Sequence, residues 1–328
     1  MVNSQSADLS SVADAEPLVR LRVAEHKVEA GNVAIVTLEP FDDRPLPSWT
    51  AGAHIAVRAG DTGIVREYSL CGSPRDRGRW TIAVRLAEDS RGGSRYVHEQ
   101  LAVGAEVLVN RLSNHFEFRP TARPCFIAGG IGITPILPMV EAANRYGADW
   151  NLIYIGRDRE HMPFMDTLES YGDRVTIIES SVSGRPNAAQ VVTDNAGSHI
   201  FSCGPEPLLD GLSAASTAIS DVTLTVERFT PRTIELPEHE IPFEVIVNST
   251  GERVPVQPDQ STLAALLAAG VRVPNSCGEG TCGSCETVVI DGIPDHRDSI
   301  LSEQEQAEGE YMYVCVSRSR TPTLTLDL

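Results

Sequence analysis

Residues 18 to 118 alternate between hydrophobic and polar positions in short runs, which Gly, Pro and Asp residues separate. The runs with this pattern are residues 18–30, 32–40, 54–60, 66–72, 79–87 and 105–112. A period of two residues is typical of strands with one buried face, so this segment predicts an antiparallel barrel or sandwich. One short helical stretch, at about residues 94–100, interrupts it.

From residue 123 to residue 229 the pattern changes to buried strands that alternate with helices. The buried-strand segments occupy residues 125–130, 151–157, 174–180, 199–204 and 223–229. The helical segments between them are residues 135–147, 163–172 and 205–219. This alternation predicts a parallel sheet with helices on both faces.

A proline-rich segment without periodicity, residues 230–240, is interpreted as an interdomain linker. A hairpin is expected at 243–257, followed by a helix that Ser261 or Thr262 caps and Gly270 ends. Further strands are expected at 286–292, 311–318 and 324–328. The expected organisation is a disordered tail (1–16), a barrel domain (17–119), an α/β domain (120–229), the linker and a small third domain (241–328).

The charge of the chain narrows the range of partners. Its 328 residues carry a formal net charge of −18, which argues against nucleic acid or an anionic membrane surface as a partner. The N-terminus is polar and acidic, so it does not resemble a signal peptide. The most apolar stretch, residues 125–140, is broken by Gly and Pro and predicts no transmembrane helix.

Four of the seven cysteines form a pattern with a specific chemistry. They are Cys277, Cys282, Cys285 and Cys315. Their spacing, C-x4-C-x2-C-x29-C, is typical of plant-type 2Fe–2S ferredoxins. Such a cluster takes three thiolates from one tight loop, and Gly278, Gly280 and Gly283 suit that loop. A structural zinc site is the alternative, although zinc sites usually carry two separated cysteine pairs.

The other three cysteines, Cys71, Cys125 and Cys203, stand singly in apolar surroundings. Buried free thiols are the usual explanation for such positions. We therefore expect a reducing, cytoplasmic compartment.

Two glycine-rich segments are candidates for binding phosphate groups. In GGIGITP, after the first strand of the α/β domain, Gly129, Gly130 and Gly132 let the backbone approach a pyrophosphate. Thr134 is expected to cap the following helix, with Pro135 near its first turn. Because the spacing is not G-x-G-x-x-G, tight packing of a turn is an equally good interpretation of these residues alone.

The second candidate combines Arg66, in REYSL, with a helix start at Gly92, Gly93 and Ser94. A guanidinium group and the exposed N–H groups of a helix start together form a good phosphate site. A surface salt bridge at Arg66 and an ordinary turn at the two glycines explain the same residues equally well.

Several motifs occur along the chain in a fixed order. They are RxYSL (66–70), GGS (92–94), GGIGITP (129–135), CGP (203–205), ERF (227–229) and the cysteine pattern. In this order they resemble the phthalate dioxygenase reductase family over the whole chain beyond the N-terminal tail. The resemblance implies a multidomain α+β and α/β protein. Its expected parts are a flavin-binding Greek-key β-barrel, a nicotinamide-binding α/β domain of the ferredoxin reductase type and a C-terminal β-grasp ferredoxin.

The resemblance also implies FMN instead of FAD. Arg66 and the Gly92–Ser94 helix start are expected to hold the FMN phosphate, and Tyr68 and Ser69 to lie against the isoalloxazine. The Ser69 hydroxyl is expected near the reactive N5 edge. The predicted flavin residues are Arg66, Glu67, Tyr68, Ser69, Leu70, Ala83, Val84, Arg85, Gly92, Gly93 and Ser94.

For the nicotinamide cofactor, the resemblance places the pyrophosphate at Gly130–Pro135 and the nicotinamide ring near Cys203. Phe229 is expected to stack on the flavin until nicotinamide displaces it. A buried thiol without such a role is the alternative for Cys203. The predicted nicotinamide residues are Gly129, Gly130, Gly132, Ile133, Thr134, Pro135, Asp158, Cys203, Gly204, Pro205 and Phe229. Ser69, Cys203 and Phe229 are the candidate catalytic residues.

Selectivity between NADH and NADPH depends on the segment after the second strand of the α/β domain. Asp158 can accept a hydrogen bond from a ribose 2′-OH, which favours NADH. Arg157 or Arg159 can instead meet a 2′-phosphate. The family preference is NADH, which we expect here.

Nicotinamide gives two electrons as hydride, a cluster accepts one at a time, and a flavin tolerates both. The expected electron route runs from NADH to FMN, then to the cluster and then to a terminal oxygenase. This oxygenase is either Rieske-type or a cytochrome P450, and we expect it to dock near the cluster. The reductase itself is expected to be a monomer. Residues 241–328 hold 5 Lys/Arg and 13 Asp/Glu, a charge of −8 that would steer this domain towards a basic patch. A cluster-based redox sensor and a zinc-stabilised binding module are the alternatives from other functional classes.

Overall fold

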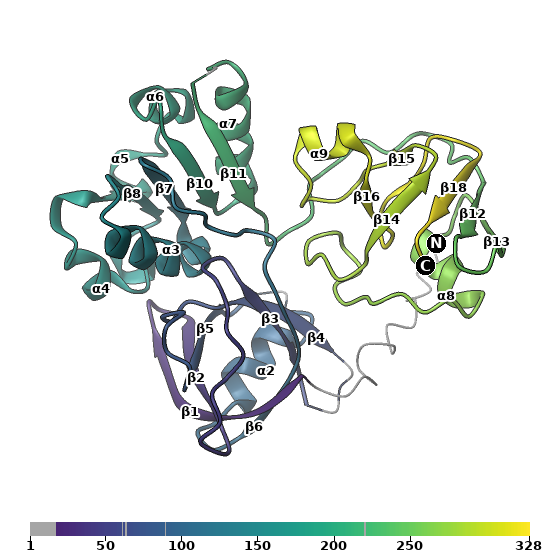
Figure 1. Cartoon of the computed structure of the whole chain (residues 1–328). Helices are drawn as coiled ribbons and strands as arrows, with labels where there is room; N and C mark the ends of the chain where they lie inside the picture. Colours follow the sequence, from purple (N-terminus) through teal and green to yellow (C-terminus); the bar gives the residue numbers. More distant parts are fainter. Residues whose placement is uncertain (1–17, 61, 63, 89, 220) are drawn as a thin grey trace. The chain divides into compact units, whose positions relative to one another are not determined.

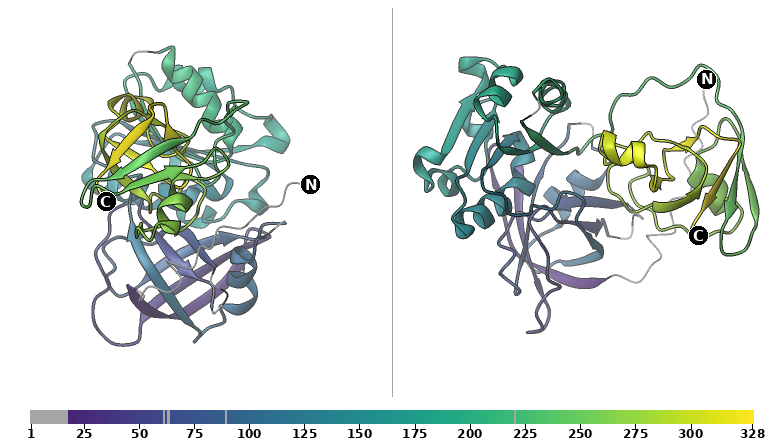
Figure 2. Two further views of the ribbon diagram at one scale, coloured as in Figure 1. Left: turned by 90° about the vertical axis from the view of Figure 1, so that its right-hand side faces the viewer. Right: turned by 45° about the horizontal axis from the view of Figure 1, so that its top comes forward.

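The computed structural model describes residues 18–328 except 61, 63, 89 and 220. Its contacts form two compact units that divide between Arg228 and Phe229. Figures 1 and 2 trace the chain through both of them. The first unit holds a six-stranded and a five-stranded sheet, and the second holds the remaining strands. The predicted disordered tail lies outside the described residues.

The first unit begins with an antiparallel sheet in the strand order β4-β3-β6-β1-β2-β5. Its strands are β1 (Val19–Glu29), β2 (Val33–Pro40), β3 (His54–Arg58), β4 (Val65–Ser69), β5 (Trp80–Arg85) and β6 (Glu106–Ser113). A bridge between Leu70 and Ile82 connects the two ends of the sheet, which closes it into a barrel. Helix α2 (Gly93–Gln100) adds Val97 to the apolar core of that barrel. The predicted antiparallel barrel is confirmed.

The same unit continues with a parallel sheet in the order β11-β10-β7-β8-β9. Its strands are β7 (Pro124–Gly129), β8 (Asn151–Gly156), β9 (Val175–Glu179), β10 (His199–Cys203) and β11 (Thr223–Glu227). The α-helices are α3 (Ile133–Tyr146), α4 (Met165–Glu169), α5 (Ser180–Ser183), α6 (Ala188–Asp194) and α7 (Glu206–Thr217). The 3₁₀ turns are η1 (Gly130–Gly132), η2 (Arg159–His161) and η3 (Gly172–Arg174).

Alternate residues of β7 show that helices cover both faces of this sheet. Phe126 and Ala128 pack with α3 in one core cluster, whereas Cys125 and Ile127 pack with α6 and α7 in another. Helices therefore cover both faces of the sheet, as the alternation of strands and helices predicts. Figure 1 shows the helices on either side of the strands.

The second unit is built on a five-stranded sheet in the order β13-β12-β18-β14-β16 and a two-stranded sheet, β15-β17. Its strands are β12 (Phe243–Val247), β13 (Arg253–Val256), β14 (Glu286–Asp291), β15 (Pro294–Asp295), β16 (Tyr311–Tyr313), β17 (Arg318–Ser319) and β18 (Thr323–Leu326). The helices are α8 (Thr262–Ala268) and α9 (Glu303–Glu308). Leu263 and Leu266 of α8 pack into the core beneath this sheet, so the predicted hairpin, helix and β-grasp arrangement are confirmed.

The predicted cap of α8 is confirmed and one strand prediction in the second unit is wrong. Of the two candidate caps the structure selects Ser261, whose hydroxyl accepts the Ala264 N–H at 3.1 Å, while Thr262 donates to the Ser317 carbonyl. The strand predicted at 311–318 ends at Tyr313, because its carbonyl accepts the N–H groups of residues 316 and 317. These two hydrogen bonds turn the chain and place Cys315 in a turn.

Candidate functional site

The four predicted cluster cysteines come together in the second unit. Cys277, Cys282 and Cys285 lie in the loop between α8 and β14, and Cys315 lies in the turn after β16. The Cys277 side chain lies beside those of Cys282 and Cys315, and the Cys315 side chain also lies beside that of Cys285. Cys277 is partly exposed, whereas the other three are buried.

Glycine allows this loop its tight course. Gly278, Gly280 and Gly283 have φ values of 68°, 69° and 76°, which residues with side chains rarely adopt. A Cβ atom on Gly280 would lie 3.1 Å from the Cα of Asp298. The Ser299 N–H donates to the Gly280 carbonyl at 2.9 Å. The loop therefore packs directly against residues 298–299.

The four thiols provide the ligands that a 2Fe–2S cluster requires, two for each iron. A structural zinc site would gather all four thiolates around one ion, whereas bridged irons share them in pairs. The Glu279 N–H donates to Cys277 Sγ at 3.3 Å, and the Ser284 hydroxyl lies 2.8 Å from Cys282 Sγ. Donors of this kind stabilise thiolate sulfur, so the loop fits a 2Fe–2S cluster.

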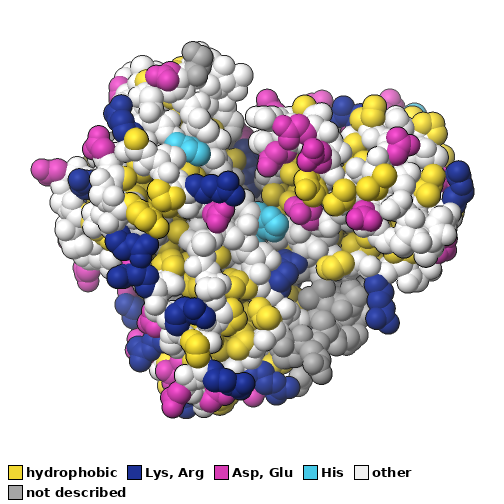
Figure 3. All heavy atoms as spheres, in the orientation of Figure 1, with side chains coloured by type: hydrophobic (Ala, Val, Ile, Leu, Met, Phe, Trp, Pro, Cys, Tyr) yellow, Lys and Arg dark blue, Asp and Glu magenta, His cyan; other side chains and the backbone are white. Residues whose placement is uncertain are grey.

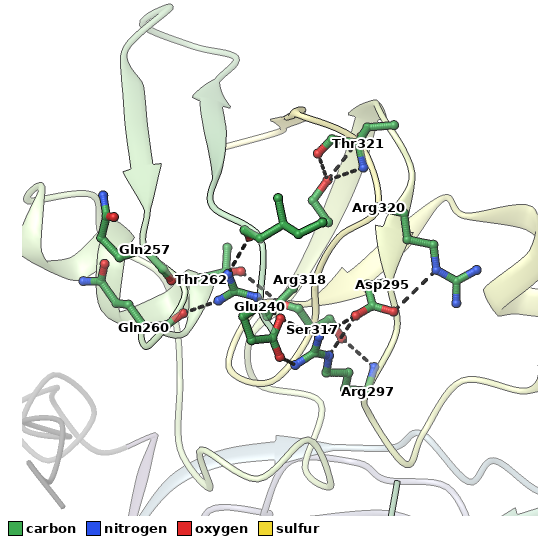
Figure 4. A network of polar contacts seen from close by, with 12 residues as sticks. Glu240, Gln257, Gln260, Thr262, Asp295, Arg297, Ser317, Arg318, Arg320 and Thr321 are labelled. Carbon is green, nitrogen blue, oxygen red and sulfur yellow. Dashed lines mark hydrogen bonds and ion pairs between the residues drawn. The ribbon is translucent and has the colours of Figure 1, made fainter. Parts of the chain in front are cut away.

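The end of the predicted linker is fixed to the second unit by ion pairs (Figure 4). Both carboxylate oxygens of Glu240 accept hydrogen bonds from Arg297, at 2.6 and 3.1 Å, and Glu240 also pairs with Arg318 at 3.0 Å. Asp295 holds Arg297 from another side at 2.7 Å. The Arg297 guanidinium keeps the pKa of Glu240 below its usual value.

The segment that binds the linker is the one that contacts the cluster loop. The Arg232 N–H, in the linker, donates to Ser299 Oγ at 2.8 Å. The Asp298 carboxylate accepts the N–H groups of residues 300 and 301 at 2.9 and 2.8 Å. Residues 295–299 thus connect the linker with Gly280 of the loop.

At the predicted flavin site, β4 meets the start of α2. A Cβ atom on Gly93 would lie 2.4 Å from Arg66 Cγ and 3.2 Å from the Tyr68 hydroxyl. The structure therefore brings Arg66 and Tyr68 to the start of the helix. Gly92, with φ 100°, allows the turn into it.

Ser90 is a polar residue of this helix start that the sequence motifs do not include. Its hydroxyl oxygen accepts the N–H groups of Gly92 and Arg95 at 3.2 and 3.3 Å. It also receives the hydroxyl of Ser94 at 2.9 Å, and Ser94 accepts the Ala87 N–H. A serine three residues before the first residue of a helix is a visible sequence signal for such N-terminal hydrogen bonds.

The other predicted flavin residues lie along β4 and β5. Ser69 is buried at the end of β4, and Leu70 bridges to β5, where Ala83 and Val84 are buried and Arg85 is exposed. The Glu67 side chain forms an ion pair with Arg111 at 2.9 Å, away from Arg66 and Tyr68 on the strand.

At the predicted nicotinamide site, two glycine turns pack together at the carboxyl ends of β7 and β10. A Cβ atom on Gly132 would lie 2.3 Å from the Cys203 carbonyl oxygen, and one on Gly204 would lie 3.0 Å from the Cα of Gly129. Gly130 differs, because a Cβ atom there would meet no protein atom within 4 Å. The Gly129–Gly132 turn is therefore closed on one side by the Cys203–Pro205 turn and open at Gly130.

Thr134 does not cap α3, contrary to the prediction. The helix starts at Ile133, and the Thr134 hydroxyl donates to the Ile131 carbonyl at 3.0 Å. Pro135 stands in the first turn of the helix. The N–H groups at this end of the helix are therefore not taken by a side chain within the described residues.

Cys203 faces Glu227, a residue of the ERF motif to which sequence reasoning assigned no role. The two are register partners on the parallel strands β10 and β11, and the thiol is hydrogen-bonded to the carboxyl group. Burial raises the pKa of Glu227 from 4.5 to about 8, and burial also raises the pKa of Cys203 well above its usual value. Both groups are therefore mainly uncharged at neutral pH.

The predicted selectivity residues follow β8. The Asp158 carboxylate accepts hydrogen bonds from the backbone N–H and the Nδ1 of His161, at 3.2 and 2.5 Å. The hydrogen bond to the His161 side chain lowers the pKa of Asp158. Arg159 pairs with Glu169, while the Arg157 side chain is exposed. Phe229 is an exposed residue at the start of the second unit, and its predicted stacking on the flavin stays a prediction.

The comparisons with known proteins agree with this arrangement. Residues 245–320 match the family model of the 2Fe-2S iron-sulfur cluster binding domain. The chain is 40% identical to phenoxybenzoate dioxygenase subunit beta of Ectopseudomonas oleovorans, over 98% of this chain and 100% of that protein. The solved structure of phthalate dioxygenase reductase aligns with a TM-score of 0.67 and 32% identity, covering 94% of this chain and 98% of that one. The chain belongs to the phthalate dioxygenase reductase family.

This reductase chain is also similar to part of a larger protein. An intact type IV self-sufficient cytochrome P450 monooxygenase aligns with a TM-score of 0.87 and 40% identity over 94% of this chain. This chain spans only 41% of that protein.

Membership of the family gives the reductase its cofactor classes: a 2Fe–2S cluster, a flavin and a nicotinamide. Within the described part of the chain, no helix has both the length and the apolar character needed to cross a bilayer.

Proposed function

We propose that this chain is the reductase component of an oxygenase system, which takes electrons from NADH and passes them through FMN and a 2Fe–2S cluster to a terminal oxygenase. The observation that carries the proposal is the similarity along almost the whole chain to phenoxybenzoate dioxygenase subunit beta. The likeness to phthalate dioxygenase reductase supports the same route, because that structure is described as modular for electron transfer from pyridine nucleotides to 2Fe–2S.

In the proposed flavin site, Arg66 and the first N–H groups of α2 hold the FMN phosphate. The missing Cβ of Gly93 leaves room for the Arg66 side chain to pass beside the helix start, where N–H groups attract anions. Ser69, buried at the end of β4, presents its hydroxyl to the isoalloxazine. A bound flavin accepts electrons as a pair and releases them singly, which matches hydride donors to a cluster.

In the proposed nicotinamide site, the pyrophosphate approaches the Gly129–Gly132 turn at Gly130, the side that no protein atom covers. Cys203 and Glu227 present an uncharged, hydrogen-bonded pair beside the nicotinamide ring. Asp158 accepts from the ribose 2′-OH once it releases His161. The last contact favours NADH over NADPH.

The electron leaves through the second unit, where Cys277 is the partly exposed thiolate of the cluster. The acceptor is a terminal oxygenase that docks near this loop. Relatives and structural neighbours include a dioxygenase subunit and a P450 monooxygenase, and both kinds of acceptor fit the proposal. We also propose that the protein is a monomer. We place it in the cytoplasm, because a reducing compartment keeps the cysteines as thiols before the cluster is inserted.

A visible spectrum of the purified protein, followed by cofactor extraction, tests this proposal directly. Flavin and cluster absorption together, with FMN released on denaturation, is the expected result. NADH should then reduce both groups under anaerobic conditions and support rapid ferricyanide reduction. A colourless protein contradicts the proposal, and cofactors that NADH reduces without onward transfer would favour a redox sensor.

A further inference from the structure

An exposed apolar stripe crosses the second unit on neighbouring strands. It consists of Val288, Ile290 and Tyr311, which are 37%, 53% and 41% exposed. Val288 and Ile290 stand two residues apart on β14, where the pairing with β18 shifts register between Val289 and Asp291. Tyr311 of β16 lies opposite Val288 in the ladder. A band of hydrophobic side chains with acidic side chains beside it is visible on this unit in Figure 3.

The core does not account for this stripe. The residues that alternate with it, Thr287 and Met312, are buried, and Met312 belongs to the core cluster of the unit. The solvent face of an antiparallel sheet is normally polar. Contiguous large apolar side chains on such a face are typical of a surface that a partner covers.

The stripe lies on the two strands that connect directly with the cluster cysteines. Strand β14 starts at Glu286, immediately after Cys285, and β16 ends two residues before Cys315. Val288 is three residues from Cys285, which is about 10 Å along a strand. The Tyr313 hydroxyl donates to the Glu286 carboxylate at 2.7 Å and ties the two strand ends together. A protein bound to the stripe therefore lies close to the cluster cysteines Cys285 and Cys315, from which the electron leaves.

The charges around the stripe define the chemistry of its partner. Between Cys277 and Val316 the sequence holds nine Asp/Glu and a single basic residue, Arg297. The Arg297 side chain is only 10% exposed and is paired with Glu240 and Asp295. Four exposed acidic residues lie on these strands or shortly before them in the sequence: Glu286 and Asp291 on β14, and Glu308 and Glu310 before β16. A complementary surface is apolar at its centre and rich in Lys and Arg at its rim.

We propose that the stripe Val288–Ile290–Tyr311 and its acidic rim form the docking face for the terminal oxygenase, which offers an apolar contact ringed by basic residues. This inference rests on the proposed function, because it names the surface through which that electron transfer takes place. The apolar centre supplies affinity, and the acidic rim steers the encounter.

The test uses the full-length holoprotein and cytochrome c, a one-electron acceptor with a lysine-rich surface, as the probe. The variant V288S/I290S replaces two exposed side chains, and I241S changes an isoleucine that is 76% exposed elsewhere in the same unit. The KM for cytochrome c should rise about fivefold or more in V288S/I290S and stay unchanged in I241S. NADH-dependent ferricyanide reduction should be the same in all three proteins.

A second variant, E308Q/E310Q, keeps the test independent of any folding defect in the first. Its KM for cytochrome c should also rise, and it should depend less on salt than that of the wild type. Unchanged KM values in both variants overturn the docking face. Failure of the proposed function gives a different result, because the wild type itself would then reduce neither ferricyanide nor cytochrome c with NADH.

Discussion

Glu227 shows how one half-buried side chain can make the stability of a fold depend on pH. Its pKa is raised from 4.5 to about 8 by burial. Below pH 4.5 the carboxyl group is protonated in the folded and the unfolded chain alike. Between 4.5 and about 8 the unfolded chain has released this proton while the folded chain keeps it, so stability falls as pH rises through that window.

Glu227→Gln should remove this loss, which is on the order of a few kcal/mol, because the amide stays neutral at every pH. We expect the melting temperature of the wild type to fall relative to that of the variant between pH 5 and pH 8. Differential scanning calorimetry at several pH values measures it. Parallel profiles of the two proteins would show that Glu227 ionises normally in the folded chain.

Two glycines of the nicotinamide turn should respond differently to the same substitution. Gly132→Ala places a Cβ atom 2.3 Å from the Cys203 carbonyl oxygen, so the two turns must separate at a cost of about 1–3 kcal/mol. Gly130→Ala meets no atom within 4 Å but has a φ of 55°, which costs about 1 kcal/mol. Its methyl group points to the open side proposed for the pyrophosphate.

The matched pair therefore separates packing from binding. Thermal unfolding should show the larger loss in Gly132→Ala, whereas steady-state kinetics should show a raised KM for NADH in Gly130→Ala despite near-normal stability. An unchanged KM for NADH in Gly130→Ala would show that the pyrophosphate does not bind on that side of the turn.

At the scale of elements, strands were predictable and local turns were not. Alternation and apolar runs report burial directly, so the strands of the six-stranded sheet and of the parallel five-stranded sheet follow from the pattern. Helix α9 was missed because it has no buried residue, although Ser302 and Glu305 form a capping box at its start. The pairing of Cys203 with Glu227 depends on the register of two parallel strands, which no local pattern encodes.

The linker supplies the prediction that belongs to this scale. Glu240→Gln should weaken the two hydrogen bonds to Arg297 and the ion pair with Arg318, at a cost of about 1–3 kcal/mol. Because residues 295–299 also contact the cluster loop, we expect faster bleaching of the cluster in dilute urea. Visible absorption over time measures it.

Glu238→Gln is the control, since this exposed glutamate lies in the same linker. The control should bleach at the wild-type rate. Equal bleaching in both variants would mean that the linker does not support the loop.

At the scale of the whole molecule, each unit has its own apolar core. The first unit buries three large clusters, in the barrel and on the two faces of the parallel sheet, while the second buries one beneath its five-stranded sheet. The predicted flavin and nicotinamide residues up to Pro205 lie in the first unit, and all four cluster cysteines lie in the second. Loss of the cluster should therefore leave the first unit folded and able to react with NADH.

Cys282→Ser tests this separation. The variant should lose the cluster absorption, keep NADH-dependent ferricyanide reduction through the flavin, and reduce cytochrome c at least about tenfold more slowly. Cys125→Ala is the control, because this buried thiol in β7 belongs to the first unit and has a pKa raised to about 12 by burial. It should keep all three properties. A Cys282→Ser protein that also loses its flavin would show that the first unit depends on the second for its fold.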